Sequence, residues 1–368
     1  MNTAEYQFYT KKEYLHELTR RFDAATPATR IVLMCMSFEP DEPEIAGLMQ
    51  SLETAAHNGA DITFTIDARC FLHPNGKPAP IYTQPGPLWY HRELPARMQP
   101  PFAAKRDMLN LLNHYPNVRA VITNTPSRRF SLPVAGRSHI KTAIVDDFVF
   151  IGGCNLDYPQ NIDLMVGWRD SSVAGQLYGH MRSVAEAGHV RSALGDTDLT
   201  IDIDDTSRLL IDVGVRDQSL IFDSALALID SAEEWLTITC QYFPNGITAE
   251  HLQAARARGV KTDIIYSDPR HQGLIGGSGQ KVSLAIEKSR HPGEMFTHMI
   301  GMDRPMVHAK IIACDKGLMI GSHNYVRAGV RLGTAEIVLE SSDVKLAEAA
   351  VTKLHQGIAA ASRTVTSQ

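Results

Sequence analysis

The stretch SHIKTAIVDDFVFIGGCN, residues 138–155, recurs in altered form as VHAKIIACDKGLMIGSHN, residues 307–324. Both stretches carry a histidine, a lysine, an aspartate, a glycine and an asparagine in the same order and at the same spacing. The offset between matched residues is constant at 169 positions (308 − 139 and 324 − 155). A constant offset over five matched residue types indicates a duplicated unit, so we expect two similar halves.

Each copy has the pattern of a β-hairpin. Side chains two positions apart on a strand project to the same side, so His139 projects with Lys141, and His308 with Lys310. The apolar residues after each lysine predict a strand, the acidic position that follows predicts a tight turn, and the next apolar run predicts a return strand. The closing glycine lets the backbone approach a ligand, and the asparagine adds an amide donor.

Two copies of this hairpin would bring together two imidazoles, two ammonium groups and two amides. Such a site suits a phosphate diester. A histidine can attack phosphorus or protonate a leaving oxygen, while lysine and asparagine stabilise the charge that builds on the other oxygens.

The spacing His-x-Lys-x4-Asp with a trailing Gly-Gly/Ser-x-Asn, present twice, resembles the signature of the phospholipase D superfamily. The resemblance covers nearly the whole chain. It implies an α/β fold of two similar α/β/α sandwich halves with mixed, mostly parallel sheets. The halves would be related by a pseudo-two-fold axis, with the active site at their interface. It also implies a phosphohistidine intermediate and a reaction that needs no metal and no cofactor.

The resemblance assigns a role to each motif residue. The first histidine, His139, is expected to be the nucleophile and the second, His308, the acid and base, although the sequence leaves their order open. The catalytic set comprises His139, Lys141, Asp146, His308, Lys310 and Asp315. Within it the two aspartates stand at hairpin turns, where they are expected to shape and anchor the motif. Contacts to phosphate oxygens are assigned to Asn155, Asn324, Gly153 and Ser322.

A nucleophilic imidazole needs a carboxylate on its far nitrogen. In the superfamily this carboxylate comes from the strand after the motif, where Glu336 and Asp163 are the candidates. Their offset is 173 (336 − 163) instead of 169, so this match is looser than that of the motifs.

Length and composition are those of an ordinary globular chain. Its 368 residues suffice for two domains, and we expect an N-terminal half over residues 1–200 and a C-terminal half over 201–368. The net charge of −5 argues against a large basic surface for nucleic acid. Five scattered cysteines with no Cys-x-x-Cys pair predict buried free thiols in a reducing compartment and no zinc site.

No secretory signal and no apolar run of about 18 residues is apparent in the sequence. We therefore expect a cytoplasmic protein that reaches the inner face of a membrane as a peripheral enzyme if its substrate is a lipid. No basic amphipathic helix is apparent either.

Both halves are expected to begin with alternating helices and strands. Leu52, Ala55 and Gly59 match Leu252, Ala255 and Gly259 at an offset of 200 (252 − 52). Because the motifs differ by 169, the first half carries about 31 extra residues (200 − 169), which we place within residues 69–137.

This insertion is rich in proline and predicts a long irregular segment. Two interpretations are open for its aromatic residues, Trp89, Tyr90 and Phe102: contact with a lipid substrate, or attachment of the segment to its own domain. The glycine-rich residues 273–279 lack the lysine of a phosphate loop and predict a mobile loop beside the site. The acidic residues 195–205 predict a solvated connection between the halves. His323 has Cys154 as its counterpart and receives no role.

Three classes of protein share this machinery in the superfamily. A binding protein would have a damaged motif, and both motifs are intact. A phospholipase D or a phosphatidyltransferase similar to cardiolipin synthases, with a phospholipid and an alcohol or water as substrates, suits the two motifs in one chain and the slight acidity. A nuclease acting on DNA or RNA is the alternative, and nucleic acid is the less favoured partner. The sequence does not decide whether the enzyme hydrolyses its substrate or transfers a group to an alcohol. It also leaves the oligomeric state open.

Overall fold

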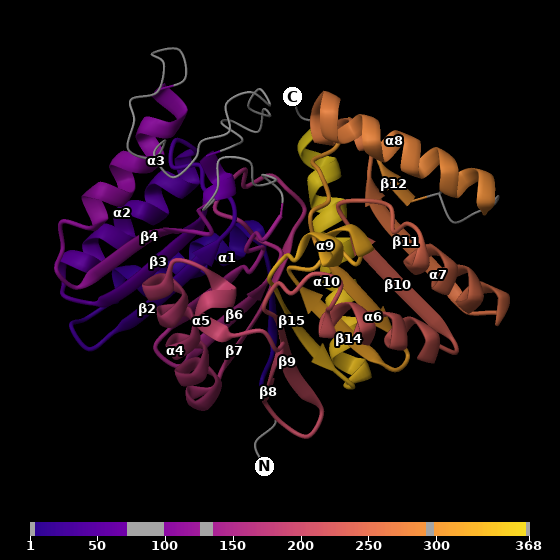
Figure 1. The fold of residues 1–368 in the computed structure, drawn as a ribbon, viewed down its shortest axis with the longest axis horizontal. Helices are drawn as coiled ribbons and strands as arrows, with labels where there is room; N and C mark the ends of the chain where they lie inside the picture. The colour runs from indigo at the N-terminus through magenta and orange to yellow at the C-terminus, as the bar shows by residue number, and fades with distance from the viewer. Residues whose placement is uncertain (1–3, 72–98, 126–134, 292–297, 366–368) are drawn as a thin grey trace.

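A computed structural model describes residues 4–71, 99–125, 135–291 and 298–365. Within these ranges the strands form two mixed sheets that stand side by side, one in each half of the chain (Figure 1). The first half, indigo to magenta, lies on the left of the view, and the second, salmon to yellow, on the right.

The first sheet has the order β1-β7-β6-β5-β2-β3-β4. Its strands are β1 (Gln7–Thr10), β2 (Arg30–Cys35), β3 (Asp61–Asp67), β4 (Val118–Thr123), β5 (Thr142–Val145), β6 (Phe148–Gly152) and β7 (Leu164–Arg169). Only the pairs β2/β3 and β3/β4 are parallel among those described. β5 joins β2, and β6 joins β5, in antiparallel register, which makes β5 and β6 the predicted hairpin.

The second sheet repeats this plan in the order β12-β11-β10-β13-β14-β15-β9-β8. Its strands are β8 (Leu199–Asp202), β9 (Ser207–Asp212), β10 (Trp235–Cys240), β11 (Lys261–Ser267), β12 (His298–Ile300), β13 (Ile311–Cys314), β14 (Gly317–Gly321) and β15 (Glu336–Ser341). Here too the described parallel pairs are confined to β10, β11 and β12. Antiparallel pairs therefore outnumber parallel ones in each sheet, and the expectation of mostly parallel sheets was wrong in this respect.

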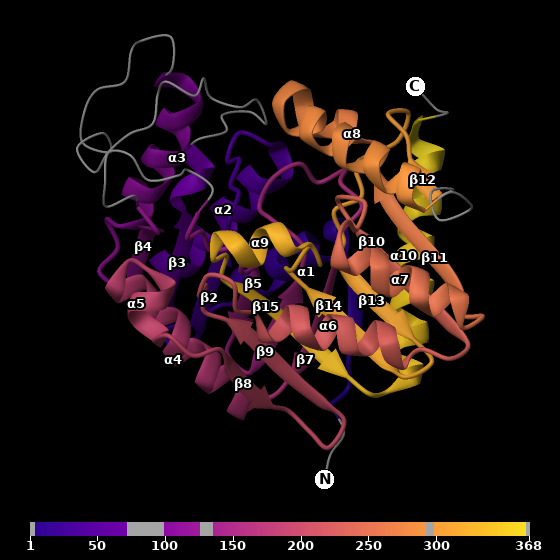
Figure 2. The ribbon, with the colours of Figure 1, turned by 45° about the vertical axis from the view of Figure 1, so that its right-hand side comes forward.

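Helices cover both faces of each sheet (Figures 1 and 2). α1 (Lys11–Asp23), α2 (Pro43–His57) and α3 (Gln99–Leu112) bury apolar residues against one face of the first sheet. α6 (Leu220–Ser231) and α7 (Ile247–Ala257) do so in the second. The remaining described helices are α4 (Ser171–Ala187), α5 (Val190–Leu194), α8 (Gly273–Arg290), α9 (Arg327–Leu332) and α10 (Val344–Val365).

One apolar core runs through both halves. α4 packs on the inner face of the first sheet and α10 on that of the second, and both contribute to a single buried cluster with residues of the two sheets. β6 contacts β14 and β15 directly. The halves are thus joined by shared apolar burial, which holds the two hairpins in a fixed relation. The expected division at residue 200 stays a prediction.

The repeat is visible at residue level. Leu52 and Leu252 are both fully buried, and Gly59 and Gly259 end α2 and α7 with φ of +91° and +95°. A residue with a Cβ adopts this conformation only at a cost, so glycine is needed to turn each chain toward the next strand.

The predicted insertion is smaller than residues 69–137. α3 and β4 fall inside that range, and β4 pairs with β3 as β12 pairs with β11, so α3 and β4 have counterparts in α8 and β12. The predicted irregular stretch falls mainly on residues 72–98 and 126–134, which lie outside the described residues together with Trp89, Tyr90 and the side chain of Phe102.

The glycine-rich residues 273–279 form the first turns of α8, so the predicted loop was wrong. A Cβ at Gly277 would lie 2.5 Å from the carbonyl oxygen of Pro269, so this glycine permits close packing of the helix on the preceding turn. The five cysteines are buried and free of disulfides, as predicted. Among the described helices none is long and apolar enough to cross a membrane.

Candidate active site

Two short bridges between the halves bring the motifs together. Ser138 pairs with Ala335, and Ile162 pairs with Val307, both in parallel register. The backbone N–H of His139 donates to Ala335 at 2.8 Å, and that of His308 donates to Ile162 at 2.8 Å. Each histidine is therefore held against the residue that precedes the acidic candidate of the other half.

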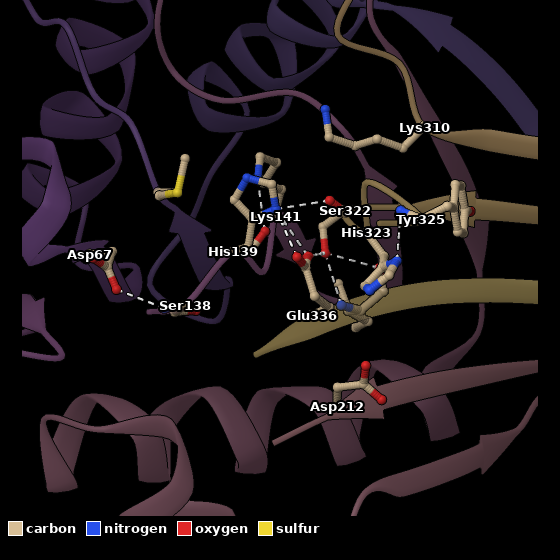
Figure 3. Close-up of polar contacts among 12 residues, drawn as sticks. Asp67, Ser138, His139, Lys141, Asp212, Lys310, Ser322, His323, Tyr325 and Glu336 are labelled. Atoms are coloured by element: carbon tan, nitrogen blue, oxygen red, sulfur yellow. Dashed lines mark hydrogen bonds and ion pairs between the residues drawn. The ribbon is translucent and has the colours of Figure 1, made fainter. Parts of the chain in front are cut away.

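The imidazole of His139 reaches across this bridge to Glu336 (Figure 3). Its Nδ1 lies 2.9 Å from Oε1 of Glu336 and 2.9 Å from the carbonyl oxygen of Ser322. A carbonyl oxygen only accepts hydrogen bonds, so Nδ1 carries the proton and donates it. In the neutral ring the lone pair is then on Nε2, the nitrogen that faces away from Glu336.

His308 repeats the arrangement with the roles of the halves exchanged. Its Nδ1 lies 2.6 Å from Oδ2 of Asp163. Asp163 and Glu336 occupy equivalent places, because Gly152 pairs with Met165 in the first sheet and Gly321 with Val338 in the second. The two carboxylates predicted from the sequence are thus matched, and each serves the histidine of the opposite half.

The two carboxylates have different surroundings. Burial opposes ionisation of Asp163, but the neighbouring His308 and Lys310 outweigh it and hold the pKa of Asp163 below its ordinary value. Burial raises the pKa of Glu336 despite nearby cations. Asp163 therefore favours a protonated His308 more strongly than Glu336 favours a protonated His139.

The histidines themselves titrate low. Burial, followed by the charges of Lys141 and Lys310, holds the pKa of His139 well below its usual range, and His308 adds to the effect. Burial and Lys310 also lower the pKa of His308, while Asp163 acts against them. Both motif lysines act on both imidazoles, which places these four buried side chains in one site.

Both motif lysines are buried beside the histidines. Lys141 Nζ donates to the carbonyl oxygen of His139 at 2.8 Å, and Lys310 Nζ donates to that of His308. Burial and the charge of Lys310 lower the pKa of Lys141 to about 7. Two ammonium groups that repel one another in a buried site favour a bound anion between them.

The asparagines differ between the halves. Asn155 Oδ1 accepts from the backbone N–H of Met36 at 3.3 Å and of Ser37 at 3.2 Å, which fixes its amide. Asn324 Oδ1 is buried and has no hydrogen-bond partner among the described atoms. An amide oxygen accepts hydrogen bonds and does not donate them, so this atom would bind a donor and not the oxygens of a phosphate. The predicted contact of Asn324 with phosphate, through its NH₂ group, stays a prediction.

Gly153 and Ser322 support the carboxylates directly. The Ser322 hydroxyl donates to Glu336 and accepts from the N–H of Ile337 at 2.9 Å. In the first half a Cβ on Gly153 would lie 2.2 Å from Oδ1 of Asp163, so glycine is required there. Their predicted contact with phosphate stays a prediction, whereas their contact with the orienting carboxylates is present.

Asp146 and Asp315 lie at the opposite ends of their hairpins from the histidines. Asp146 Oδ1 accepts from the N–H of Arg30 at 2.9 Å, and Asp315 Oδ1 accepts from Glu233 and Glu234 at 3.1 Å each. These contacts fit the expected anchoring role and leave the carboxylates without a contact to the imidazoles.

His323 is buried next to the site, and its Nδ1 accepts from the N–H of Tyr325 at 2.9 Å. Burial lowers the pKa of His323 to about 4, so the ring is neutral near pH 7. Sequence reasoning also missed Asp67, whose Oδ2 accepts from the N–H of Ser138 at 2.7 Å (Figure 3). In the described residues no group of three or more His, Cys, Asp and Glu side chains is placed to hold a metal ion.

One part of the chain matches the model of a known protein family. Residues 225–357 match the family described as "Cardiolipin synthase, PLD-like domain", and this range includes the second motif. The second half of the chain therefore contains a domain similar to that family. The first motif lies outside the matched range.

Solved structures with a similar fold align with nearly all of the chain. Phosphatidylserine synthase from Haemophilus influenzae Rd KW20 aligns with a TM-score of 0.65 and 14% identity, covering 96% of this chain and 86% of that protein. Polyphosphate kinase from Porphyromonas gingivalis aligns with a TM-score of 0.53 and 14% identity, covering 96% of this chain and 46% of the kinase. At these identities the likeness concerns the fold. A search of curated protein sequences gives no match.

Proposed function

We propose that this protein is an enzyme of the phospholipase D superfamily that transfers or hydrolyses the phosphatidyl group of a phospholipid through a phosphohistidine intermediate. The observation that carries the proposal is the crossed pair His139–Glu336 and His308–Asp163 beside two buried lysines. It provides two imidazoles with free Nε2 atoms and a strongly cationic setting for a phosphodiester.

The proposed reaction has two displacements at phosphorus. In the first, Nε2 of His139 attacks and forms a P–N bond, the P–O bond to the leaving alcohol breaks, and Nε2 of His308 gives that oxygen a proton. In the second, an acceptor alcohol or water returns a proton to His308, its oxygen attacks phosphorus, and the P–N bond breaks.

The different surroundings of the histidines support this order. The nucleophile has to be neutral, and the pKa of His139 lies well below its usual range because of burial and the cations around it. The acid has to hold a proton, and Asp163, whose own pKa is lowered, acts to keep one on His308. A bound phosphate anion would offset Lys141 and Lys310 and so raise the pKa of His308 further.

A surface of α8 supports a lipid substrate over a nucleic acid. Val282 and Ile286, one turn apart, are 61% and 45% exposed. The exposed charged side chains of this helix are all basic, Lys281, Lys288 and Arg290. Apolar side chains among cations suit the headgroup region of an anionic bilayer. A basic amphipathic helix was not expected here, because the glycines of residues 273–279 predicted a loop.

This surface lies at the same edge as the site. α8 follows the carboxyl end of β11, and Lys310 precedes β13, which pairs with the carboxyl end of β10. β12 lies beside α8 in both views (Figures 1 and 2). The exposed Met299 lies in β12, and the exposed Met302 follows it. A bilayer that contacts α8 would therefore lie at the same edge of the second sheet as Lys310 and His308.

Products test the proposal. The purified protein is incubated with vesicles of phosphatidylglycerol in phosphatidylcholine and, separately, with single- and double-stranded DNA, each beside His139→Ala. Phosphatidic acid or cardiolipin, absent with the variant, is the expected result. Cleavage of DNA that the variant loses, without any lipid product, would establish the nuclease alternative instead.

Vesicle binding tests the α8 surface. We expect Val282→Ser/Ile286→Ser and Lys281→Glu/Lys288→Glu each to weaken sedimentation with anionic vesicles by about tenfold. Both variants should hydrolyse the soluble diester bis(p-nitrophenyl) phosphate as the wild type does. Lys12→Glu/Lys345→Glu makes the same charge change at exposed sites away from α8 and should bind normally.

A further inference from the structure

Each half has an aspartate and an arginine two positions apart, directly at the end of its second parallel strand. Asp67 and Arg69 follow β3, and Asp268 and Arg270 follow β11, at an offset of 201 (268 − 67). In both halves the backbone N–H of the arginine donates to Oδ1 of the aspartate, at 2.7 Å for Arg69 and 2.8 Å for Arg270. The two pairs are equivalent members of the duplicated unit.

In the second half the arginine is neutralised by its own aspartate. Arg270 Nε lies 3.1 Å from Oδ1 and 3.0 Å from Oδ2 of Asp268, and Nη2 lies 2.7 Å from Oδ2. This is a bidentate ion pair, in which the guanidinium fork matches the carboxylate.

In the first half the aspartate is occupied by other groups. Asp67 Oδ2 accepts from the N–H of Ser138 at 2.7 Å and from Asn124 Nδ2 at 2.8 Å, and Oδ1 lies 3.5 Å from Arg137 Nη1. The guanidinium of Arg69 has no carboxylate within ion-pair distance in the part of the chain that the structure describes. Among the described residues, the same position thus holds a paired arginine in one half and an unpaired one in the other.

The unpaired arginine stands next to the reacting histidine. Asp67 binds the backbone N–H of both Arg69 and Ser138, the residue before His139, so one buried carboxylate fixes the two segments together. The charge of Arg69 adds to burial and the lysines in lowering the pKa of His139. It also opposes the rise that burial causes in the pKa of Tyr242, a residue of the other half. Arg69 therefore lies at the seam where the halves meet.

We propose that Arg69 binds, through a bidentate contact, a second anionic group of the substrate, a phosphate or a carboxylate next to the scissile phosphodiester. This inference rests on the proposed function for the identity of the reacting group. The two motif lysines act on the first phosphate as point charges, whereas a guanidinium recognises a planar pair of anionic oxygens. A half-buried cation without a protein partner is stabilised when such a group arrives.

Titration calorimetry with small anions tests this without turnover. Pyrophosphate is compared with inorganic phosphate, and 3-phosphoglycerate with glycerol 3-phosphate, so that each pair differs by one phosphate or one carboxylate. We expect the wild type to bind pyrophosphate or 3-phosphoglycerate, which carry the second anionic group, about tenfold more tightly than the matched ligand that lacks it. The pair that shows the preference identifies the second group.

Arg69→Gln should abolish this preference and change the affinity for inorganic phosphate less than about threefold. Arg270→Gln, the equivalent change in the other half, should keep it. A wild type without any preference, a preference that survives in Arg69→Gln, or an equal loss for all four anions would overturn the proposal. If Arg69→Gln melts below the assay temperature, Arg69→Lys replaces it, because it keeps the charge and loses the fork. If Arg69→Lys bound the anion with the second group as preferentially as the wild type does, the proposed bidentate contact would be wrong.

The binding test and the test of function fail separately. Absence of any lipid product that depends on His139 would overturn the proposed function and leave the titrations interpretable. An intact lipid reaction with no role for Arg69 in anion preference would overturn only the inference drawn here.

Discussion

Glu336 of the second half holds Nδ1 of His139 of the first at 2.9 Å, and the reverse contact joins Asp163 to Nδ1 of His308 at 2.6 Å. Neither half therefore contains a complete histidine–carboxylate pair of its own. Each imidazole obtains its tautomer and orientation from the opposite half, so the site exists only when the halves are docked.

The first prediction concerns these orienting carboxylates. Glu336→Ala should lower kcat on a soluble phosphodiester by on the order of 10²–10⁴-fold, because His139 loses the group that fixes Nδ1–H. Glu340→Ala, on the same strand but paired with the surface residue Arg208, serves as the control. Equal losses of kcat in both variants would show that the strand, and not the carboxylate, is what matters.

The second prediction concerns Gly153. Gly153→Ala should displace Asp163, because the new Cβ would lie 2.2 Å from its Oδ1, and should cost about 1–3 kcal/mol of stability together with most of the activity. Gly175→Ala on α4 has open space around its Cβ and should stabilise by about 0.5–1 kcal/mol. Denaturant unfolding and turnover measure both. A Gly153→Ala protein as stable and active as the wild type would contradict the close approach.

Much of this fold follows from periodicity and repetition. The hairpins and the five matched motif residues could be predicted, because strand alternation and the offset are local properties of the chain. The pair Asp163 and Glu336 followed from the resemblance to the phospholipase D superfamily, since its offset of 173 (336 − 163) departs from the 169 of the motifs. The crossed contacts could not, since nothing in either copy states which half each carboxylate faces. That choice depends on how the sheets pack.

Two features of the structure could not be predicted from the sequence, each for a physical reason. Residues 273–279 carry glycines that usually interrupt helices, yet Gly277 is needed for close packing on Pro269. Arg69 and Arg270 have the same local sequence pattern and differ only in what occupies the neighbouring aspartate. A difference of that kind is tertiary, and a repeat in the sequence conceals it.

The third prediction concerns Asp315 as an anchor. Three backbone N–H groups and Lys316 outweigh partial burial and lower the pKa of Asp315 to about 2. A carboxyl whose pKa is lowered by folding stabilises the protein above its unfolded pKa, and this stability is lost as the pH falls through the folded value. Asp315→Asn should therefore cost about 1–2 kcal/mol at pH 7, and its deficit relative to the wild type should shrink from about pH 4 toward pH 2.

Thermal unfolding of both proteins across this range measures the deficit. A deficit that stays constant with pH would mean that the charge of Asp315 contributes nothing. Activity per folded molecule should stay within about twofold at pH 7, because Asp315 contacts the start of β10 and not the imidazoles.

The last prediction concerns the charge of Lys141. Burial and the charge of Lys310 lower its pKa to about 7, whereas an unfolded lysine titrates near 10.4. Between these values the unfolded chain binds the proton and the folded protein does not, so this group makes stability rise with pH from about 7 to about 10. Below pH 7 the folded protein carries the full cost of a buried charge. Lys141→Met removes the charge, so the free energy of unfolding of the variant minus that of the wild type should be most positive near pH 6. This difference should fall by roughly 1–4 kcal/mol as the pH rises to 10.

Lys12→Met, at an exposed site, is the control, and its difference in the free energy of unfolding should not change with pH. If the difference for Lys141→Met also stayed constant with pH, burial would not destabilise the charged form of Lys141. The proposal that the site favours a bound anion would then lose its main support.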